Sequence, residues 1–348
     1  MSAITIAGAI ERALAHEDLS RDEMATVVGA IMDGIATPAQ IAGLLVALRA
    51  KGEAVSELVG AATAMRARAL PLANTDPLRS IDTCGTGGDG SGTVNISTLA
   101  AIVIAACGGV VAKHGNRAQS SKCGSADVLE ALGVAIDVEP AVVERSIQRA
   151  GIGFLFAPRF HSATRNASGV RRELGIRTIF NLLGPLTNPA AVRHQVVGVF
   201  SPSWCEPVAS ALGALGLRRA AVVHGDGGLD EIAVRGATSV ALWDEAEADT
   251  RMFELTPRAF GVDELDPAGL AGGDARHNAA MLRAVLDGRD RGVVRAAAAM
   301  TAALGLELLE PGAFELARLP AHYARAITCV ESGAARGVLD RWIEASAP

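Results

Sequence analysis

The sequence predicts an α/β protein, in which a small N-terminal helical domain precedes a larger α/β domain with a mostly parallel central sheet. Residues 4–70 are helical in pattern throughout, because apolar residues recur at spacings of three and four. From residue 81 onward, short apolar strands alternate with helices, as in a parallel sheet with crossover helices. The length of 348 residues, half of them apolar, allows two domains with large cores.

Capping residues mark two helix starts within the helical part. Ser20 precedes an acidic first turn, and Thr37 precedes Pro38. A capping oxygen satisfies an orphan N–H group, and a proline in the first helical position has no N–H to leave unpaired. Residues 71–78, rich in proline, asparagine and aspartate, are predicted to form a linker.

The alternating part predicts the order of strands and helices. The expected strands are residues 81–84, 110–113, 152–156, 195–200, 219–224 and 239–243. The expected helices are residues 96–107, 126–132, 140–150 and 204–215, followed by helices from residue 277 onward. Residues 161–189 interrupt the alternation and could leave the sheet to rejoin the N-terminal helices. The predicted domains are residues 1–74, joined by helices from about 161–189, and residues 75–160 with 190–348.

Bulk composition excludes several classes of protein. A net charge of -6 and an aromatic content of 3% argue against a nucleic-acid surface. The five cysteines contain no CxxC pair, which argues against zinc and against a disulfide framework. The N-terminus lacks the pattern of a signal peptide, and no apolar run is long enough for a membrane span. We therefore expect a cytoplasmic protein with no nucleic-acid or membrane partner.

The most informative segment is residues 81–98, with the sequence IDTCGTGGDGSGTVNIST. A short apolar strand leads into a glycine-dense loop, and a polar run then opens an apolar helix. Glycines let backbone N–H groups approach phosphate oxygens, and the helix start adds orphan donors and the positive end of its dipole. The segment predicts a site for a phosphorylated ligand, with a simple tight turn as the alternative.

Two further segments also follow apolar strands. Residues 113–122, KHGNRAQSSK, combine cations, an amide and hydroxyls, which suit an anionic, oxygen-rich ligand. Residues 226–231, DGGLDE, offer adjacent carboxylates, which suit Mg²⁺. Because the carboxyl ends of parallel strands meet at one edge, we expect both segments beside the glycine-dense loop. The alternatives are solvated surface turns or, for the carboxylates, a general acid and base.

The arginines of residues 165–177 form a fourth candidate group. One of them could clamp a substrate carboxylate through two parallel hydrogen bonds, although most helical arginines simply face water. The residues alone do not distinguish Arg171 from Arg172 or Arg177.

The known nucleotide-binding motifs do not fit. The spacing GTGG differs from the dinucleotide-binding GxGxxG, and no lysine follows the glycines as in a P-loop. A noncatalytic phosphate-binding module would leave Asp230 and Glu231 unexplained. The combination therefore favours an enzyme.

Six motifs in order resemble the anthranilate phosphoribosyltransferase family of tryptophan biosynthesis, which has a nucleoside-phosphorylase-like fold. They are GTGGD at 85–89, NIST at 95–98, KHGNR at 113–117, GSADVLEALG at 124–133, FNLLGPLTNP at 180–189 and LDE at 229–231. The resemblance implies transfer of the 5-phosphoribosyl group from phosphoribosyl pyrophosphate to anthranilate, with release of pyrophosphate. It also implies Mg²⁺ as the cofactor, a hinge between the domains, and a homodimer formed through the helical domain.

The resemblance further implies which residues form the site. Those expected around phosphoribosyl pyrophosphate are Gly85, Gly88, Asp89, Thr93, Asn95, Ile96, Ser97, Thr98, Lys113, His114, Gly115, Asn116, Arg117, Ala118, Gln119, Ser120, Ser121 and Ser125. Those expected at anthranilate are Gly85, Asn116 and Arg171, with His114 at its entry, and those expected at the metal are Ser97, Asp230 and Glu231. No catalytic base is expected, because an aromatic amine is already neutral at pH 7; catalysis would rest on positioning and electrostatic stabilisation.

Three positions depart from the usual family pattern: Val94, Cys123 and His277. None is assigned to chemistry, although Cys123 lies in the loop expected nearest the phosphates. The alternative function is that of a pyrimidine nucleoside phosphorylase, which shares the fold and should lack Arg171 in this role and the LDE acids.

Overall fold

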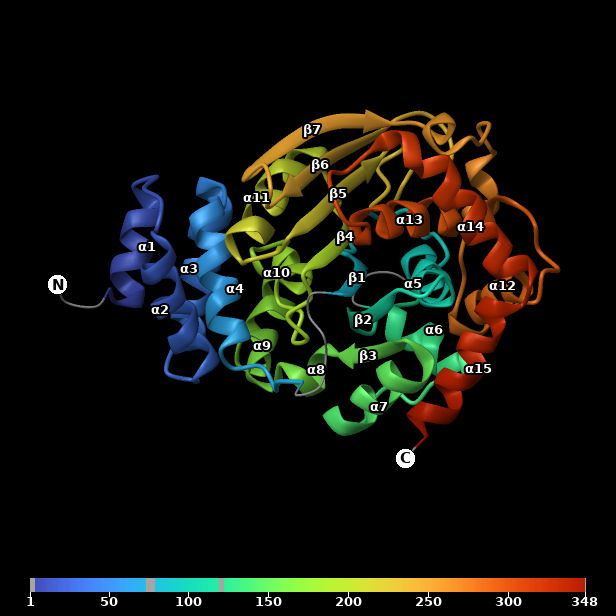
Figure 1. Cartoon of the computed structure of the whole chain (residues 1–348). Coiled ribbons are helices and arrows are strands. Elements are labelled where there is room, and N and C mark those ends of the chain that lie inside the picture. Colours follow the sequence, from blue (N-terminus) through green and yellow to red (C-terminus); the bar gives the residue numbers. More distant parts are fainter. Residues whose placement is uncertain (1–3, 73–78, 119–121, 348) are drawn as a thin grey trace.

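A bundle of four helices at one end of the molecule begins the chain in the computed structural model, which describes residues 4–72, 79–118 and 122–347 (Figure 1). The helices are α1 (Ile6–Leu14), α2 (Arg21–Met32), α3 (Pro38–Lys51) and α4 (Val55–Arg66). Ser20 and Thr37 cap α2 and α3 as predicted, because each side-chain oxygen accepts the N–H group three residues on. Most of the predicted linker, residues 73–78, lies outside the described residues.

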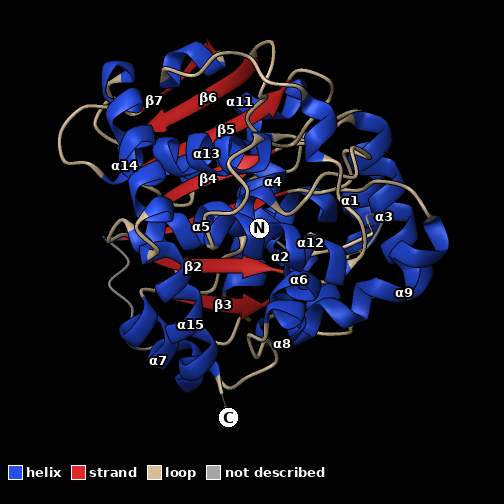
Figure 2. Cartoon of the chain, turned by 90° about the vertical axis from the view of Figure 1, so that its right-hand side faces the viewer, coloured by secondary structure: helices blue, strands red, loops and turns tan. Residues whose placement is uncertain are grey.

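A seven-stranded sheet forms the centre of the larger part, in the order β3-β2-β1-β4-β5-β6-β7 (Figure 2). The strands are β1 (Ser80–Gly85), β2 (Val110–Gly115), β3 (Ile152–Phe156), β4 (His194–Gly198), β5 (Arg219–Gly225), β6 (Thr238–Asp244) and β7 (Asp249–Leu255). Neighbouring strands from β3 to β5 pair in parallel, whereas β6 and β7 are antiparallel. The mostly parallel sheet is confirmed, and all six predicted strands are present.

The sequence analysis missed the edge strand β7. Of its seven residues only Leu255 is buried, so the strand carries no apolar stripe that alternation could reveal. Its pairing with β6 comes from the tight turn that joins the two strands, residues 245–248.

Helices cover both faces of the sheet. They are α5 (Ile96–Ala106), α6 (Ser125–Leu132), α7 (Pro140–Ala150), α8 (Ala157–Phe160), α9 (Arg165–Leu174), α10 (Phe180–Leu186), α11 (Cys205–Ala214), α12 (Ala275–Leu286), α13 (Val293–Leu309), α14 (Leu319–Glu331) and α15 (Ala334–Ser346). Val196 and Val197 on β4 point to opposite faces, as successive strand residues must. Val196 joins the core that contains α5 and α13, and Val197 joins a second core that α11 shares with the N-terminal helices.

The chain returns to the N-terminal helices after β3. Ala167 and Val170 of α9 lie in the same core cluster as α2 and α3, and Asn166 Nδ2 donates to the Met32 carbonyl at 2.7 Å. The segment that contains α9 and α10 therefore packs against the N-terminal helices, as the sequence suggested. The exact domain boundaries stay a prediction.

The composition also led to expectations about disulfides and membrane-spanning segments. All five cysteines are free thiols, so there is no disulfide framework. Within the described residues, none of the helices has both the length and the apolar character that crossing a membrane requires.

Candidate active site

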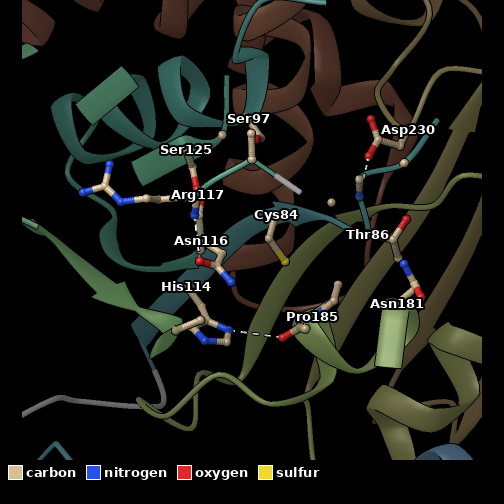
Figure 3. Close-up of a pocket in the computed structure, with 18 of the residues that line it drawn as sticks. Cys84, Thr86, Ser97, His114, Asn116, Arg117, Ser125, Asn181, Pro185 and Asp230 are labelled. Atoms are coloured by element: carbon tan, nitrogen blue, oxygen red, sulfur yellow. Dashed lines mark hydrogen bonds between the residues drawn. The ribbon is translucent and has the colours of Figure 1, made fainter. Parts of the chain in front are cut away.

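A cavity of about 590 Å³ lies at the carboxyl ends of β1, β2 and β5 and extends to α9 and α10 (Figure 3). It brings together most of the predicted site residues from four separate segments. Those that line it are Gly85, Gly88, Asp89, Thr93, Asn95, Ser97, Thr98, Lys113, His114, Gly115, Asn116, Arg117, Ala118, Ser125, Arg171, Asp230 and Glu231.

The remaining predicted residues do not line the cavity in the described part of the chain. Ile96 has a fully buried side chain, and its N–H group donates to the Val94 carbonyl at 2.7 Å. Gln119, Ser120 and Ser121 lie outside the described residues.

The glycine loop, residues 86–92, forms one wall of the cavity. Four of its glycines have left-handed backbone angles, which explains why this segment needs residues without a Cβ atom. The loop is held at its start, where Thr86 N–H donates to the Gly198 carbonyl at 2.8 Å and Gly87 N–H donates to Asp230 Oδ2 at 3.0 Å. The acidic turn thus positions the glycine loop directly.

Asp230 and Glu231 face this loop from the turn after β5. Burial, reinforced by the negative charge of Asp89, raises the pKa of Asp230 to about 7. Burial, reinforced by Asp230, raises the pKa of Glu231 to about 8. Glu231 Oε1 accepts the Ser97 N–H at 3.1 Å, so it sits at the positive end of α5.

The donor set of this turn fits a hard cation. The two neighbouring carboxylates and the Ser97 hydroxyl supply oxygen ligands. The raised pKa values of both acids show that nearby cations do not fully balance their negative charge. Mg²⁺ takes only one or two protein carboxylates and completes its shell with water and substrate phosphates. Within the described residues, no group of three or more His, Cys, Asp or Glu side chains is arranged to hold a metal ion.

Lys113 is a buried cation whose charge acts on Glu231 of the acidic turn. Its side chain is 1% exposed, its ammonium donates to the Thr83 carbonyl, and Nζ lies 3.5 Å from Ser97 Oγ. Burial lowers the pKa of Lys113, while the charges of Asp82, Cys84 and Glu231 oppose that change. A fixed cation at this depth can neutralise charge on a bound anion.

Asp82 is a supporting residue that the sequence analysis did not select. Its Oδ1 accepts the His114 N–H at 3.2 Å, and its Oδ2 accepts Asn188 Nδ2 at 2.8 Å. Burial raises its pKa to about 6. An aspartate within a predicted strand was the available signal, because a carboxylate buried in a sheet requires partners.

Arg171, on the last turn of α9, faces the same cavity. Its guanidinium carbon lies 5.0 Å from the centre of the Phe180 ring, and burial lowers its pKa. None of the described carboxylates lies within ion-pair distance of Arg171. The cavity therefore contains a cation available to a ligand carboxylate.

His114 also lines the cavity. Its Nδ1 lies 3.1 Å from the Gly184 carbonyl (Figure 3). The centre of its ring is 5.2 Å from that of the His161 ring. Burial lowers the pKa of His114 to about 3, so the ring is neutral at pH 7. With Nδ1 donating to Gly184, Nε2 is left as an acceptor, and among the described residues it has no partner.

Two predicted ligand-binding residues are engaged in contacts within the protein. Arg117 pairs with Asp127 and Glu130 on α6. Asn95 Nδ2 donates to the Cys123 carbonyl at 3.2 Å, and the Cys123 thiol lies 3.4 Å from Asn95 Oδ1. The unusual Cys123 thus packs beside Asn95 in the wall of the site.

Comparison with known proteins agrees with this geometry. Two family descriptions match the chain: "Glycosyl transferase family, helical bundle domain" over residues 7–69 and "Glycosyl transferase family, a/b domain" over residues 78–335. An anthranilate phosphoribosyltransferase of Moorella thermoacetica is 50% identical over 338 residues, which cover 96% of this chain and 97% of that protein. The chain belongs to the anthranilate phosphoribosyltransferase family. It is therefore an enzyme of tryptophan biosynthesis, a glycosyltransferase of the pentosyl class.

Solved members of the anthranilate phosphoribosyltransferase family share the whole fold. The Thermus thermophilus protein has a TM-score of 0.89 and 43% identity, over 97% of this chain and 99% of that one. The Saccharomyces cerevisiae protein, solved in complex with PRPP and Mg, has a TM-score of 0.87 and 27% identity, over 99% and 98% of the two chains.

Proposed function

We propose that the cavity binds phosphoribosyl pyrophosphate with Mg²⁺ at the glycine loop and anthranilate at Arg171, and transfers the 5-phosphoribosyl group to the anthranilate amine. Pyrophosphate is released. The observation that carries the proposal is the placement, around one cavity, of a pair of carboxylates, a glycine loop and an arginine that forms no ion pair with a described carboxylate. That arrangement matches one substrate with several phosphates and another with a carboxylate.

The pyrophosphate side is built from main-chain donors and one buried cation. Phosphate oxygens are expected at the N–H groups of the glycine loop and of the first turn of α5. Asp230, Glu231 and the Ser97 hydroxyl would hold Mg²⁺, which when bound supplies positive charge to the leaving pyrophosphate. Lys113, fixed by Thr83, adds charge at the same end of the cavity.

The anthranilate side positions the nucleophile. Arg171 would pair with the carboxylate, while Gly85 and Asn116, which line the same cavity, would contact anthranilate. As pyrophosphate leaves, positive charge develops on the anomeric carbon, and the amine must already lie within reach. The neutral amine needs no strong base for attack.

The decisive experiment mixes the protein with Mg²⁺, phosphoribosyl pyrophosphate and anthranilate and follows anthranilate fluorescence. We expect the fluorescence to disappear only when all components are present. A persistent signal beside a working relative would contradict the proposal. Phosphorolysis of a pyrimidine nucleoside by this protein would support the alternative function instead.

The variant Arg171→Ala is expected to raise the KM for anthranilate roughly 10- to 100-fold, because a charge-assisted hydrogen-bonded pair contributes about 1.5–3 kcal/mol. The KM for phosphoribosyl pyrophosphate should change by less than about twofold. Steady-state kinetics with each substrate varied in turn measures both. Arg172→Ala removes the exposed neighbouring arginine and is the matched control. Equal losses for both substrates would indicate a collapsed site and contradict the assigned role.

Binding of Mg²⁺ is expected to strengthen as the pH rises from 6 to 8.5. In the ion-free chain the pKa values of Asp230 and Glu231 are raised to about 7 and about 8, so protons compete with the ion below that range. Because of these raised pKa values, the folded ion-free protein binds more protons than the unfolded chain does. Its free energy of unfolding therefore falls as the pH rises to about 8. The thermal shift caused by Mg²⁺ should therefore be larger at pH 8.5 than at pH 6. A shift independent of pH would contradict this prediction.

The proposal includes a cytoplasmic homodimer formed through the helical bundle. Three large apolar side chains are exposed there: Leu14 on α1, Ile35 after α2 and Val46 on α3. Free thiols agree with a reducing compartment. Sedimentation of the purified protein tests the dimer.

A further inference from the structure

Arg177 reaches the glycine loop from outside the cavity. It lies in the link between α9 and α10, two residues after Gly175 ends α9. One guanidinium nitrogen, Nη2, donates to the Gly88 carbonyl, and the guanidinium carbon lies 4.4 Å from the centre of the Phe200 ring. Gly88 and Asp89 line the cavity, whereas Arg177 does not.

The glycine loop has few other attachments. In the described part of the chain, Asp230 and Arg177 supply the hydrogen bonds that join residues 87–90 to other segments. Those of Asp230 reach Gly87 at 3.0 Å and Asp89 at 3.5 Å. Glycines contribute no side chains that could pack, so these few contacts determine the conformation of the loop.

The contact with Gly88 also sets the direction of the next N–H group. A trans peptide unit is planar, and its carbonyl and N–H groups point in opposite directions. Because Arg177 holds the Gly88 carbonyl and does not line the cavity, the planar peptide unit directs the Asp89 N–H away from Arg177. Backbone N–H groups directed at one point are the donors that phosphate-binding loops use.

Arg177 is itself held in place for this contact. Its guanidinium lies over Phe200, whose N–H donates to Thr86 Oγ1 at 3.1 Å at the start of the same loop. No described carboxylate forms an ion pair with Arg177. Its polar contact is therefore directed to the loop and not to a surface acid.

We propose that Arg177 is a positioning residue for the pyrophosphate end of the substrate: its guanidinium, lying over the Phe200 ring, holds the Gly88 carbonyl and so presents the Asp89 N–H to a phosphate oxygen. The inference rests on the proposed function and extends it to a residue outside the cavity. It assigns different roles to two arginines six residues apart, since Arg171 serves anthranilate and Arg177 serves phosphoribosyl pyrophosphate.

The test compares Arg177→Ala, Arg177→Lys and the control Arg172→Ala in the full-length enzyme. For Arg177→Ala we expect the KM for phosphoribosyl pyrophosphate to rise about tenfold or more, with the KM for anthranilate and kcat changed less than about threefold. Arg177→Lys, which keeps one donor but loses the planar contact with Phe200, should lie between wild type and alanine. Arg172→Ala should match wild type. Equal changes in both KM values, or no change, would overturn the proposal.

A binding measurement separates this inference from the function itself. Calorimetry with Mg²⁺ and inorganic pyrophosphate needs no transfer reaction, and Arg177→Ala should weaken pyrophosphate binding by about the same factor as its KM effect. An inactive wild type would contradict the proposed function, whereas unchanged pyrophosphate binding by Arg177→Ala would overturn the inference alone. Phe200→Leu, which removes the ring but leaves Arg177, should give a smaller loss in the same direction. Unfolding temperatures close to wild type show that each variant is folded.

Discussion

The double variant Asp230→Asn with Glu231→Gln is expected to lose nearly all Mg²⁺-dependent transfer. Loss of the charge that holds the ion removes several kcal/mol of stabilisation from the leaving pyrophosphate, and about 3 kcal/mol already corresponds to roughly 100-fold in kcat/KM. Titration of activity with Mg²⁺ measures the effect. The curve should be low and nearly flat up to concentrations that saturate the wild type.

The same variant is expected to fold normally. Asn and Gln keep an oxygen that accepts the N–H groups of Gly87 and Ser97, so the loop contacts of the two acids persist. Because burial favours the uncharged form of both acids, the amides resemble the state that the ion-free protein prefers. The unfolding temperature without Mg²⁺ at pH 8 should therefore equal or exceed that of the wild type.

Asp226 provides the matched control, since it is an exposed acid on the same turn and outside the cavity. Asp226→Asn should keep the wild-type dependence on Mg²⁺. A normal Mg²⁺ profile in the double variant would remove the metal-binding role from Asp230 and Glu231.

The sequence was sufficient to predict the features that depend on local pattern. Apolar runs of four to six residues predicted six of the seven strands, and the glycine-dense loop after β1 indicated the ligand wall of the cavity. The position of Asp230 and Glu231 after β5 could also be predicted, because the carboxyl ends of parallel strands share one edge. These predictions require only the local sequence pattern and the rule that the carboxyl ends of parallel strands lie at one edge of the sheet.

Contacts between distant segments could not be predicted in the same way. Arg117 lines the cavity and also pairs with two acids of α6, and nothing in its own motif reveals those partners. Arg177 and Arg171 look equivalent on a sequence, and only the folded chain shows that Arg171 lines the cavity beside Phe180 whereas Arg177 contacts the glycine loop from outside it. Tertiary packing, not residue type, decides which charged groups remain free.

Gly198 is another residue whose role depends on packing alone. It ends β4 and pairs in register with Gly85 on β1. A Cβ atom at Gly198 would lie 1.6 Å from the carbonyl oxygen of Asp230 and 2.5 Å from its carbonyl carbon. Those are main-chain atoms, so no rotation of a side chain can relieve the collision, and the acidic turn would have to move.

Gly198→Ala is therefore expected to displace Asp230 and, with it, the glycine loop that Asp230 holds. We expect a loss of roughly 100-fold or more in kcat/KM, because a shift of about 1 Å already misaligns reacting groups. Overpacking should also lower the free energy of unfolding by about 1–3 kcal/mol. Gly169→Ala is the control: it lies in α9 with nothing within 4 Å of the added Cβ atom, and alanine there should preserve activity while favouring the helix. Denaturant unfolding with Mg²⁺-dependent kinetics measures both effects. Wild-type kinetics in Gly198→Ala would show that the acidic turn does not require this close approach.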